Sequence, residues 1–201
     1  MARKFYNRKD FAVELSDTQI RMLEEKRARF DAMGEQAQYD VFLSHSTEDM
    51  ALIKQIRDVL EESLDISVYI DWDEDAGTSR DEIADVVKSA MNRSKSFLVV
   101  KTDNSDDSSW VSWETGYFDK KDSDKIAVLL VENDDDEFNS ETFKHQEYLK
   151  NYIILGPDDV VDFIKSGSSH IKGKTNLVNA PFVVAKPEKM VRPHRNDQLR
   201  S

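Results

Sequence analysis

Short runs of apolar residues alternate along the chain with stretches in which apolar residues recur every three or four positions. Five runs have the length and the Val and Ile content of buried strands: residues 39–45, 66–71, 96–101, 126–131 and 151–155. The stretches between them carry helical stripes, among them Leu52 to Leu60, Ile83 to Met91 and Val160 to Ile164. Strands buried on both faces form continuous apolar runs, so this alternation predicts an α/β fold with a five-stranded parallel sheet and helices on both faces.

Two extensions flank this pattern. Before it, residues 17–36 predict an amphipathic helix in which Asp17 could cap the start and Gly34 could end the last turn. After it, the last residues contain an apolar patch at 180–184 among basic residues. We therefore divide the chain into an N-terminal extension (1–37), one central domain (38–166) and a basic C-terminal extension (167–201).

Charge and composition narrow the possible functions. The net charge is −12, yet residues 171–201 hold seven Lys or Arg residues against two acidic ones. An acidic body argues against nucleic-acid binding, which needs a basic face for phosphates. No run of about 20 apolar residues is present for a membrane span, no secretory signal opens the chain, and there is no cysteine. These features predict a cytoplasmic protein that uses neither membrane nor nucleic acid.

Candidate chemistry gathers where the predicted strands end. Three segments follow strands, namely Ser44 to Thr47, Asp71 to Ser79 and Thr102 to Glu114, and in parallel sheets such segments converge on one cleft. The four histidines lack metal-ligand spacing, and the acidic run after residue 70 is more typical of a solvated loop than of a magnesium site. We predict no metal site and no cofactor.

The stretch SSWVSWETGYFD, residues 108–119, places Glu114 among large aromatic residues. Trp110 lies four residues before Glu114 and Tyr117 three after it, so the three share a helical face. An indole beside a carboxylate can stack on a flat ring and raise the pKa of the carboxylate by desolvation. Such a group suits binding of sugar hydroxyls or stabilisation of an oxocarbenium-like centre. Alternatively, the aromatic residues are core and Glu114 is a solvated helix residue.

Four stretches in this order resemble the TIR (Toll/interleukin-1 receptor) domain of the bacterial type. They are YDVFLSHSTED from residue 39, ISVYIDWDEDAG from residue 66, SFLVVKTDNSDDSSW from residue 96, and SSWVSWETGYFD from residue 108. The last is similar to the W-x-x-x-E helix of the family. The resemblance covers about residues 38 to 166 and implies a flavodoxin-like fold of five strands.

The resemblance also implies an activity. Some members of the family cleave NAD⁺ between nicotinamide and ribose, and they carry a glutamate at the position of Glu114. By this resemblance Glu114 is the catalytic residue, Trp110 and Tyr117 help to wall the pocket, and Ser44, His45 and Ser46 lie near the nicotinamide ribose. The loop with Trp72, Ala76 and Gly77 would gate the pocket and contact a neighbouring molecule.

The expected function follows from the same resemblance. The chain is similar to TIR NADases of bacterial anti-phage systems such as Thoeris, which release nicotinamide and ADP-ribose or a cyclic isomer that a separate effector protein senses. NAD⁺ would be the substrate, and TIR–TIR self-association would complete the pocket. Two alternatives remain open: a non-catalytic TIR scaffold or host-mimicking virulence factor, and a nucleoside deoxyribosyltransferase of similar fold.

Overall fold

The computed structural model describes residues 6–71, 80–105, 108–132, 146–156 and 159–168. Its strands are β1 (Tyr6–Asn7), β2 (Tyr39–Ser44), β3 (Val68–Ile70), β4 (Ser94–Lys101), β5 (Ile126–Glu132) and β6 (Ile153–Ile154). Its α-helices are α1 (Asp17–Met33), α2 (Met50–Leu64), α3 (Arg80–Asn92), α4 (Ser109–Asp122) and α5 (Val160–Ser166). All five predicted strands are present, as β2 to β6.

The strands form one parallel sheet in the order β1-β5-β4-β2-β3, and β6 also pairs with β5. β6 lies against the start of β5, at Ala127 and Val128, and β1 lies against its end, at Val131 and Glu132. β1 was not predicted, because two residues are too short to show an alternating pattern. The N-terminal segment therefore joins the sheet at the end of β5.

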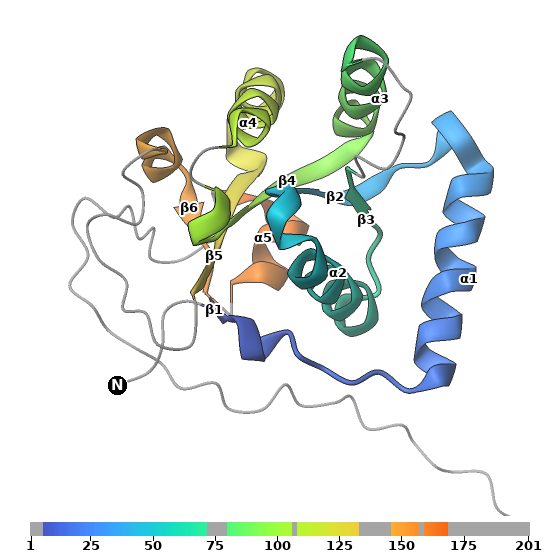
Figure 1. The fold of residues 1–201 in the computed structure, drawn as a ribbon. Helices are drawn as coiled ribbons and strands as arrows, with labels where there is room; N and C mark the ends of the chain where they lie inside the picture. The colour runs from blue at the N-terminus through green and yellow to red at the C-terminus, as the bar shows by residue number, and fades with distance from the viewer. Residues whose placement is uncertain (1–5, 72–79, 106–107, 133–145, 157–158, 169–201) are drawn as a thin grey trace, which may run out of the picture.

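Helices cover both faces of the sheet, as the continuous apolar runs predicted (Figure 1). α2 and α5 pack on one face with Ile53, Ile56 and Phe163 fully buried, and the other face is covered by α3 and α4 with Met91 and Phe118 fully buried. Successive strand residues contribute to opposite cores. None of the described helices is both long and apolar enough to span a bilayer.

α1 stands beside α2 and next to the β3 edge of the sheet (Figure 1). Its N-cap is Ser16 and not Asp17, because the Ser16 side chain accepts the N–H of Gln19 while the Gln19 side chain accepts the N–H of Ser16. It ends at Gly34, whose φ of 53° favours glycine. Leu23 is the buried residue of this helix.

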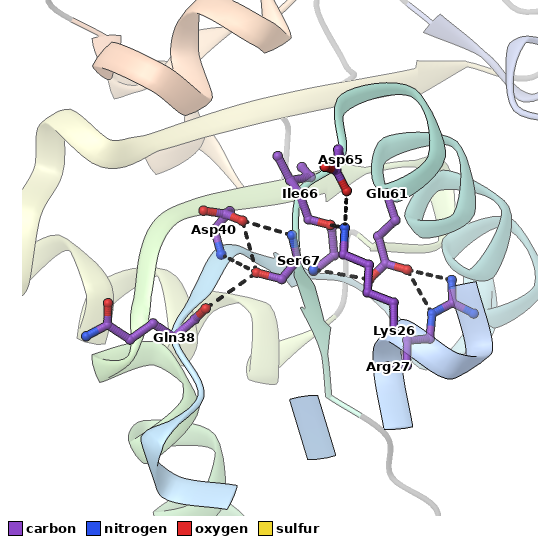
Figure 2. Close-up of polar contacts among 9 residues, drawn as sticks. Lys26, Arg27, Gln38, Asp40, Glu61, Asp65, Ile66 and Ser67 are labelled. Carbon is purple, nitrogen blue, oxygen red and sulfur yellow. Dashed lines mark hydrogen bonds and ion pairs between the residues drawn. The ribbon is translucent and has the colours of Figure 1, made fainter. Parts of the chain in front are cut away.

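Polar contacts attach α1 to the neighbouring elements (Figure 2). Arg27 donates to the carboxylate of Glu61 on α2, with Nε 2.8 Å from Oε2. Lys26 donates to the carboxylate of Asp65 and to the carbonyl of Ile66, over 2.8 and 3.0 Å. Ion pairs and hydrogen bonds therefore link α1 to the end of α2 and the segment before β3, and the ring of Phe30 also stacks on Tyr39.

Candidate active site

Glu114 lies in the interior of the protein, with only 1% of its surface exposed. The hydroxyl of Ser44, the last residue of β2, donates to Oε2 of Glu114 over 2.5 Å. Glu114 lies on α4. Ser108 caps the first turn of this helix by accepting the N–H of Val111. The burial of Glu114 rules out the alternative in which it is a solvated helix residue.

Burial raises the pKa of Glu114 from 4.5 to about 8. The charge of Asp71 adds to the rise, whereas the hydrogen bond from Ser44 and the nearby indole N–H of Trp110 act against it. The carboxyl group therefore holds its proton at neutral pH unless a positive charge comes close. Its second oxygen, Oε1, is buried and has no hydrogen-bond partner among the described residues. A ligand with a hydrogen-bond donor would give Oε1 a partner, and a ligand with a positive charge would stabilise the ionised form of Glu114.

Trp110 lies close to two acidic side chains. Its indole N–H donates to Oδ2 of Asp71, the residue that follows β3, over 2.9 Å, and the same indole lowers the pKa of Glu114. Its ring packs against Trp113 with centroids 4.8 Å apart. Trp110 as a whole is half-buried.

His45 and Ser46 continue from β2 and are both buried, each 6% exposed. The Nδ1 atom of His45 lies 3.2 Å from the carbonyl oxygen of Leu43, and because a carbonyl only accepts, Nδ1 carries the proton. Burial lowers the pKa of His45, so the ring is neutral and Nε2 is an acceptor. Nε2 is buried without a hydrogen-bond partner among the described residues.

The structure brings together only part of the predicted site. Glu114 and Ser44 are in direct contact, and Trp110 lies close enough to Glu114 to change its pKa. Tyr117 instead packs against Trp113 and accepts a hydrogen bond from Asn92 of α3 over 3.2 Å. Three predicted residues, Trp72, Ala76 and Gly77, lie outside the described residues.

Asp71 is a site residue whose contact the sequence did not reveal. The sequence placed it in an acidic run after the second strand, whereas its carboxylate holds the indole of Trp110 and influences Glu114. Its partner lies 39 positions away along the chain. No local pattern reports such a contact, and only the shared edge of a parallel sheet made it possible to expect the two loops side by side.

Residues 41–153, more than half of the chain, match the sequence model of the TIR domain. The chain belongs to the TIR domain family. The matched region runs from the third residue of β2 to the first residue of β6 and contains every residue of the candidate site.

Two curated relatives share this region. The chain is 35% identical over 130 residues to a protein of Bacillus cereus (strain MSX-D12) named "Probable 3' cyclic ADP-D-ribose synthase ThsB'", covering 62% of this chain and 64% of that one. It is also 35% identical over 125 residues to TIR2 of Cytobacillus dafuensis, named as a candidate cyclic ADP-D-ribose synthase, covering 57% of this chain and 32% of that one. The chain thus spans about two thirds and one third of the lengths of these relatives.

Solved TIR-containing structures resemble the chain more distantly. A metazoan TIR-STING receptor from C. gigas aligns over 64% of this chain and 41% of its own, with 19% identity and a TM-score of 0.47. The TIR domains of the activated Roq1 resistosome, which recognises the pathogen effector XopQ, align over 66% of this chain and 82% of their own, with 23% identity and a TM-score of 0.38.

Proposed function

We propose that this protein is an NAD⁺ nucleosidase that cleaves the bond between nicotinamide and ribose. Two features support the proposal: membership of the TIR family with relatives named as cyclic ADP-D-ribose synthases, and the environment of Glu114. The observation that carries it is the buried carboxyl group of Glu114, held by Ser44 on one oxygen and without a described partner on the other. A purely adhesive domain has no need of such a costly group in its interior.

Glu114 would act on the ribose next to nicotinamide. The nicotinamide ring of NAD⁺ is positively charged, and its approach favours the ionised form of Glu114, whose pKa is raised in the free protein. When the bond from ribose C1′ to the ring nitrogen breaks, its electron pair goes to nicotinamide and positive charge develops on the ribose. A buried carboxylate stabilises this oxocarbenium-like centre and accepts hydrogen bonds from ribose hydroxyls.

The neighbouring residues would bind and orient the substrate. Trp110, fixed by Asp71, offers an indole face on which a flat ring can stack. The Nε2 atom of His45 can accept a hydrogen bond from a hydroxyl or amide group of the substrate. Ser44 keeps Glu114 in place through its hydroxyl. Ser46, Trp72, Ala76 and Gly77 remain assigned to the pocket by their positions in the family motifs, whereas the contacts of Tyr117 with Trp113 and Asn92 favour a packing role for that residue.

The fate of the ribosyl centre determines the product. Attack by water at C1′ gives ADP-ribose and releases a proton, whereas attack by a nucleophile of the same ADP-ribose molecule gives a cyclic isomer. The names of the two relatives favour a cyclic product. We infer that this product serves as a signal in bacterial anti-phage immunity, made in the cytoplasm, sensed by a separate effector protein and formed when chains associate through TIR–TIR contacts.

Measurement of nicotinamide release from NAD⁺, with separation of linear and cyclic products, tests this function. We expect the wild type to release nicotinamide at high protein concentration and Glu114→Gln to lose at least about a hundredfold in kcat, the usual effect of removing a charge that stabilises the transition state. Gln has nearly the same shape and can still accept from Ser44, so the loss would come from the charge.

Glu61→Gln is the matched control. Glu61 is also buried and has a raised pKa because of burial, but it lies on α2 and binds Arg27 and the N–H of Val68. We expect Glu61→Gln to keep the activity of the wild type per folded molecule. Equal nicotinamide release by the wild type and Glu114→Gln would overturn the catalytic role of Glu114, whereas no release from the wild type when chains are assembled would favour a scaffold in place of an enzyme.

A further inference from the structure

Asp49 is an acidic residue in the interior whose carboxylate makes three contacts. It lies in the short helix η3 (Thr47–Asp49) that follows the site residues of the β2 loop, and it is 3% exposed. Its Oδ1 atom accepts from Nη2 of Arg8 and Nδ2 of Asn104, both over 2.9 Å. Its Oδ2 atom accepts from the hydroxyl of Thr102. A buried carboxylate needs such compensation, and here three donors provide it.

The three donors come from segments that are far apart in the sequence. Arg8 belongs to the N-terminal segment that continues from β1, Thr102 follows β4, and Asn104 lies in η4 (Asp103–Ser105). They are 41, 53 and 55 positions from Asp49. The carboxylate thus joins the loop after β2, the loop after β4 and the N-terminus of the described chain at the carboxyl edge of the sheet.

The contacts continue from Thr102 to the start of α4. The N–H of Ser105 donates to the carbonyl of Thr102, and the N–H of Ser108 donates to the carbonyl of Ser105, each over 3.2 Å. Ser108 is the residue that caps α4. On the other side, the N–H of Asp49 donates to the carbonyl of Ser46 over 3.0 Å. A chain of hydrogen bonds therefore connects the loop of His45 and Ser46 with the helix of Glu114.

A capping role does not explain the position of Asp49. It is the residue before α2, yet its side chain makes no capping hydrogen bond to that helix. Its oxygens are turned instead to donors from outside the helix. The side chain of Asp49 thus connects the loop after β2 with the N-terminal segment and the loop after β4.

We propose that Asp49 is a positioning residue that, with Arg8, holds the loop of Ser44, His45 and Ser46 against the loop that leads to Glu114. The relevance of this contact to catalysis rests on the proposed NAD⁺-cleaving function. The N-terminal segment acquires a role in this way: it supplies Arg8, whose ion pair with Asp49 fixes the two loops at the edge of the site. Positioning of this kind matters because small displacements of groups around a reacting centre lower the rate strongly.

Asp40, near the opposite end of β2, provides a matched control. Its Oδ2 atom accepts the N–H and the hydroxyl of Ser67 over 2.9 and 3.0 Å, and its Oδ1 atom accepts Nζ of Lys95 over 2.8 Å (Figure 2 shows the contacts with Ser67). Both aspartates thus combine an ion pair with a hydroxyl donor, Asp40 within β2 and Asp49 in η3 beyond the other end of that strand. Asp40 lies at the amino end, away from Glu114, so Asp40→Asn repeats the chemical change without touching the site loops.

Amide hydrogen exchange and steady-state kinetics on the full chain test the proposal. In Asp49→Asn we expect the amides of Asp49, Ser105 and Ser108 to exchange about tenfold faster or more, while the core strands stay protected. We expect kcat, per folded molecule and at saturating NAD⁺, to fall about tenfold or more. Asp40→Asn should leave these amides and kcat within about twofold of the wild type. Arg8→Ala should reproduce part of the faster exchange and part of the loss in kcat. Arg8→Lys should show smaller changes than Arg8→Ala, because the ion pair is kept.

The outcomes separate the two proposals. Unchanged exchange at these three amides in Asp49→Asn and Arg8→Ala would overturn the positioning role, whatever the activity. Equal losses of kcat in Asp49→Asn and Asp40→Asn at the same folded fraction would also overturn it. If the wild type does not cleave NAD⁺, the proposed function fails, and the exchange data still decide whether Asp49 holds the loops. If Asp49→Asn does not fold, Arg8→Ala carries the test, because Arg8 is 34% exposed and tolerates truncation better.

Discussion

At the scale of the residue, Glu114 combines two properties that rarely occur together in a core: it is ionisable and almost fully buried. One oxygen is held by Ser44, and the other has no described partner. Such an arrangement disfavours the negative charge of Glu114 in the free protein and favours binding of a cation beside it. Burial of this group lowers the folding stability, and a role in binding or chemistry explains why the group is present.

The raised pKa of Glu114 predicts a dependence of stability on pH. Between its ordinary pKa of 4.5 and the folded value of about 8, the folded protein keeps a proton that the unfolded chain releases. Folding stability contributed by this group is therefore full below about pH 4.5 and is lost as pH rises through the pKa of about 8. We expect the wild type to lose on the order of 2 kcal/mol between pH 6 and pH 9 that Glu114→Gln does not lose.

Urea unfolding of both proteins at pH 6 and pH 9 measures this difference. Other groups that titrate in this interval are common to the two proteins, so their effects cancel in the comparison. A wild type that loses no more stability than Glu114→Gln across the interval would show that Glu114 is already ionised at neutral pH.

At the scale of the element, ion pairs contribute to the attachment of α1, whereas α2 to α5 pack on the apolar cores of the sheet. Arg27 contacts Glu61, whose side chain is 4% exposed, and also Asp58. Glu61 has a raised pKa because of burial, and Arg27 acts in the opposite direction. Removal of the guanidinium leaves Glu61 buried without its main positive partner, so the contact weighs more than an exposed ion pair would.

Arg27→Ala should therefore loosen α1. We expect a loss of roughly 1–3 kcal/mol in the free energy of unfolding, together with faster amide exchange in α1 than in the strands. Arg29→Ala is the control on the same helix, because Arg29 is 81% exposed and lies 3.8 Å from Glu25; its effect should stay within about 0.5 kcal/mol. Similar losses in the two variants would show that the buried ion pair contributes no more than a surface pair.

At the scale of the whole molecule, the net charge of −12 acts on the self-association that we propose. Like charges on two chains repel each other at a distance, and dissolved salt screens this repulsion. The acidic surface thereby keeps chains apart at low concentration. This would leave the assembled state as a minor population until concentration or a partner raises it.

Association and turnover should consequently rise together. We expect the average mass in sedimentation to increase with protein concentration and to increase further when NaCl is raised from about 20 to 200 mM, where the screening length falls below about 10 Å. NAD⁺ turnover per chain should increase over the same range. Turnover per chain that is independent of concentration, with a constant mass, would mean that one chain forms the complete site.

Much of the element order could be read from the sequence because it depends on local patterns. Apolar runs such as 96–101 and 126–131 mark strands buried on both faces, and stripes such as Leu52 to Leu60 mark helices that cover them. The cap of α1 was assigned one residue too late, because Ser16 and Asp17 are both suitable and only the contact with Gln19 decides between them.

By itself, the sequence determined the alternation of strands and helices, the parallel sheet, and the edge at which Glu114, Ser44 and Trp110 should meet, because the period of apolar residues is a local property. Tertiary structure alone decided which atoms meet there. The contact of Ser44 with Glu114 spans 70 positions, that of Arg8 with Asp49 spans 41, and β1 is too short to leave a pattern. The burial that raises the pKa of Glu114 arises in the same way, because it comes from side chains that only the packed sheet and helices bring around it.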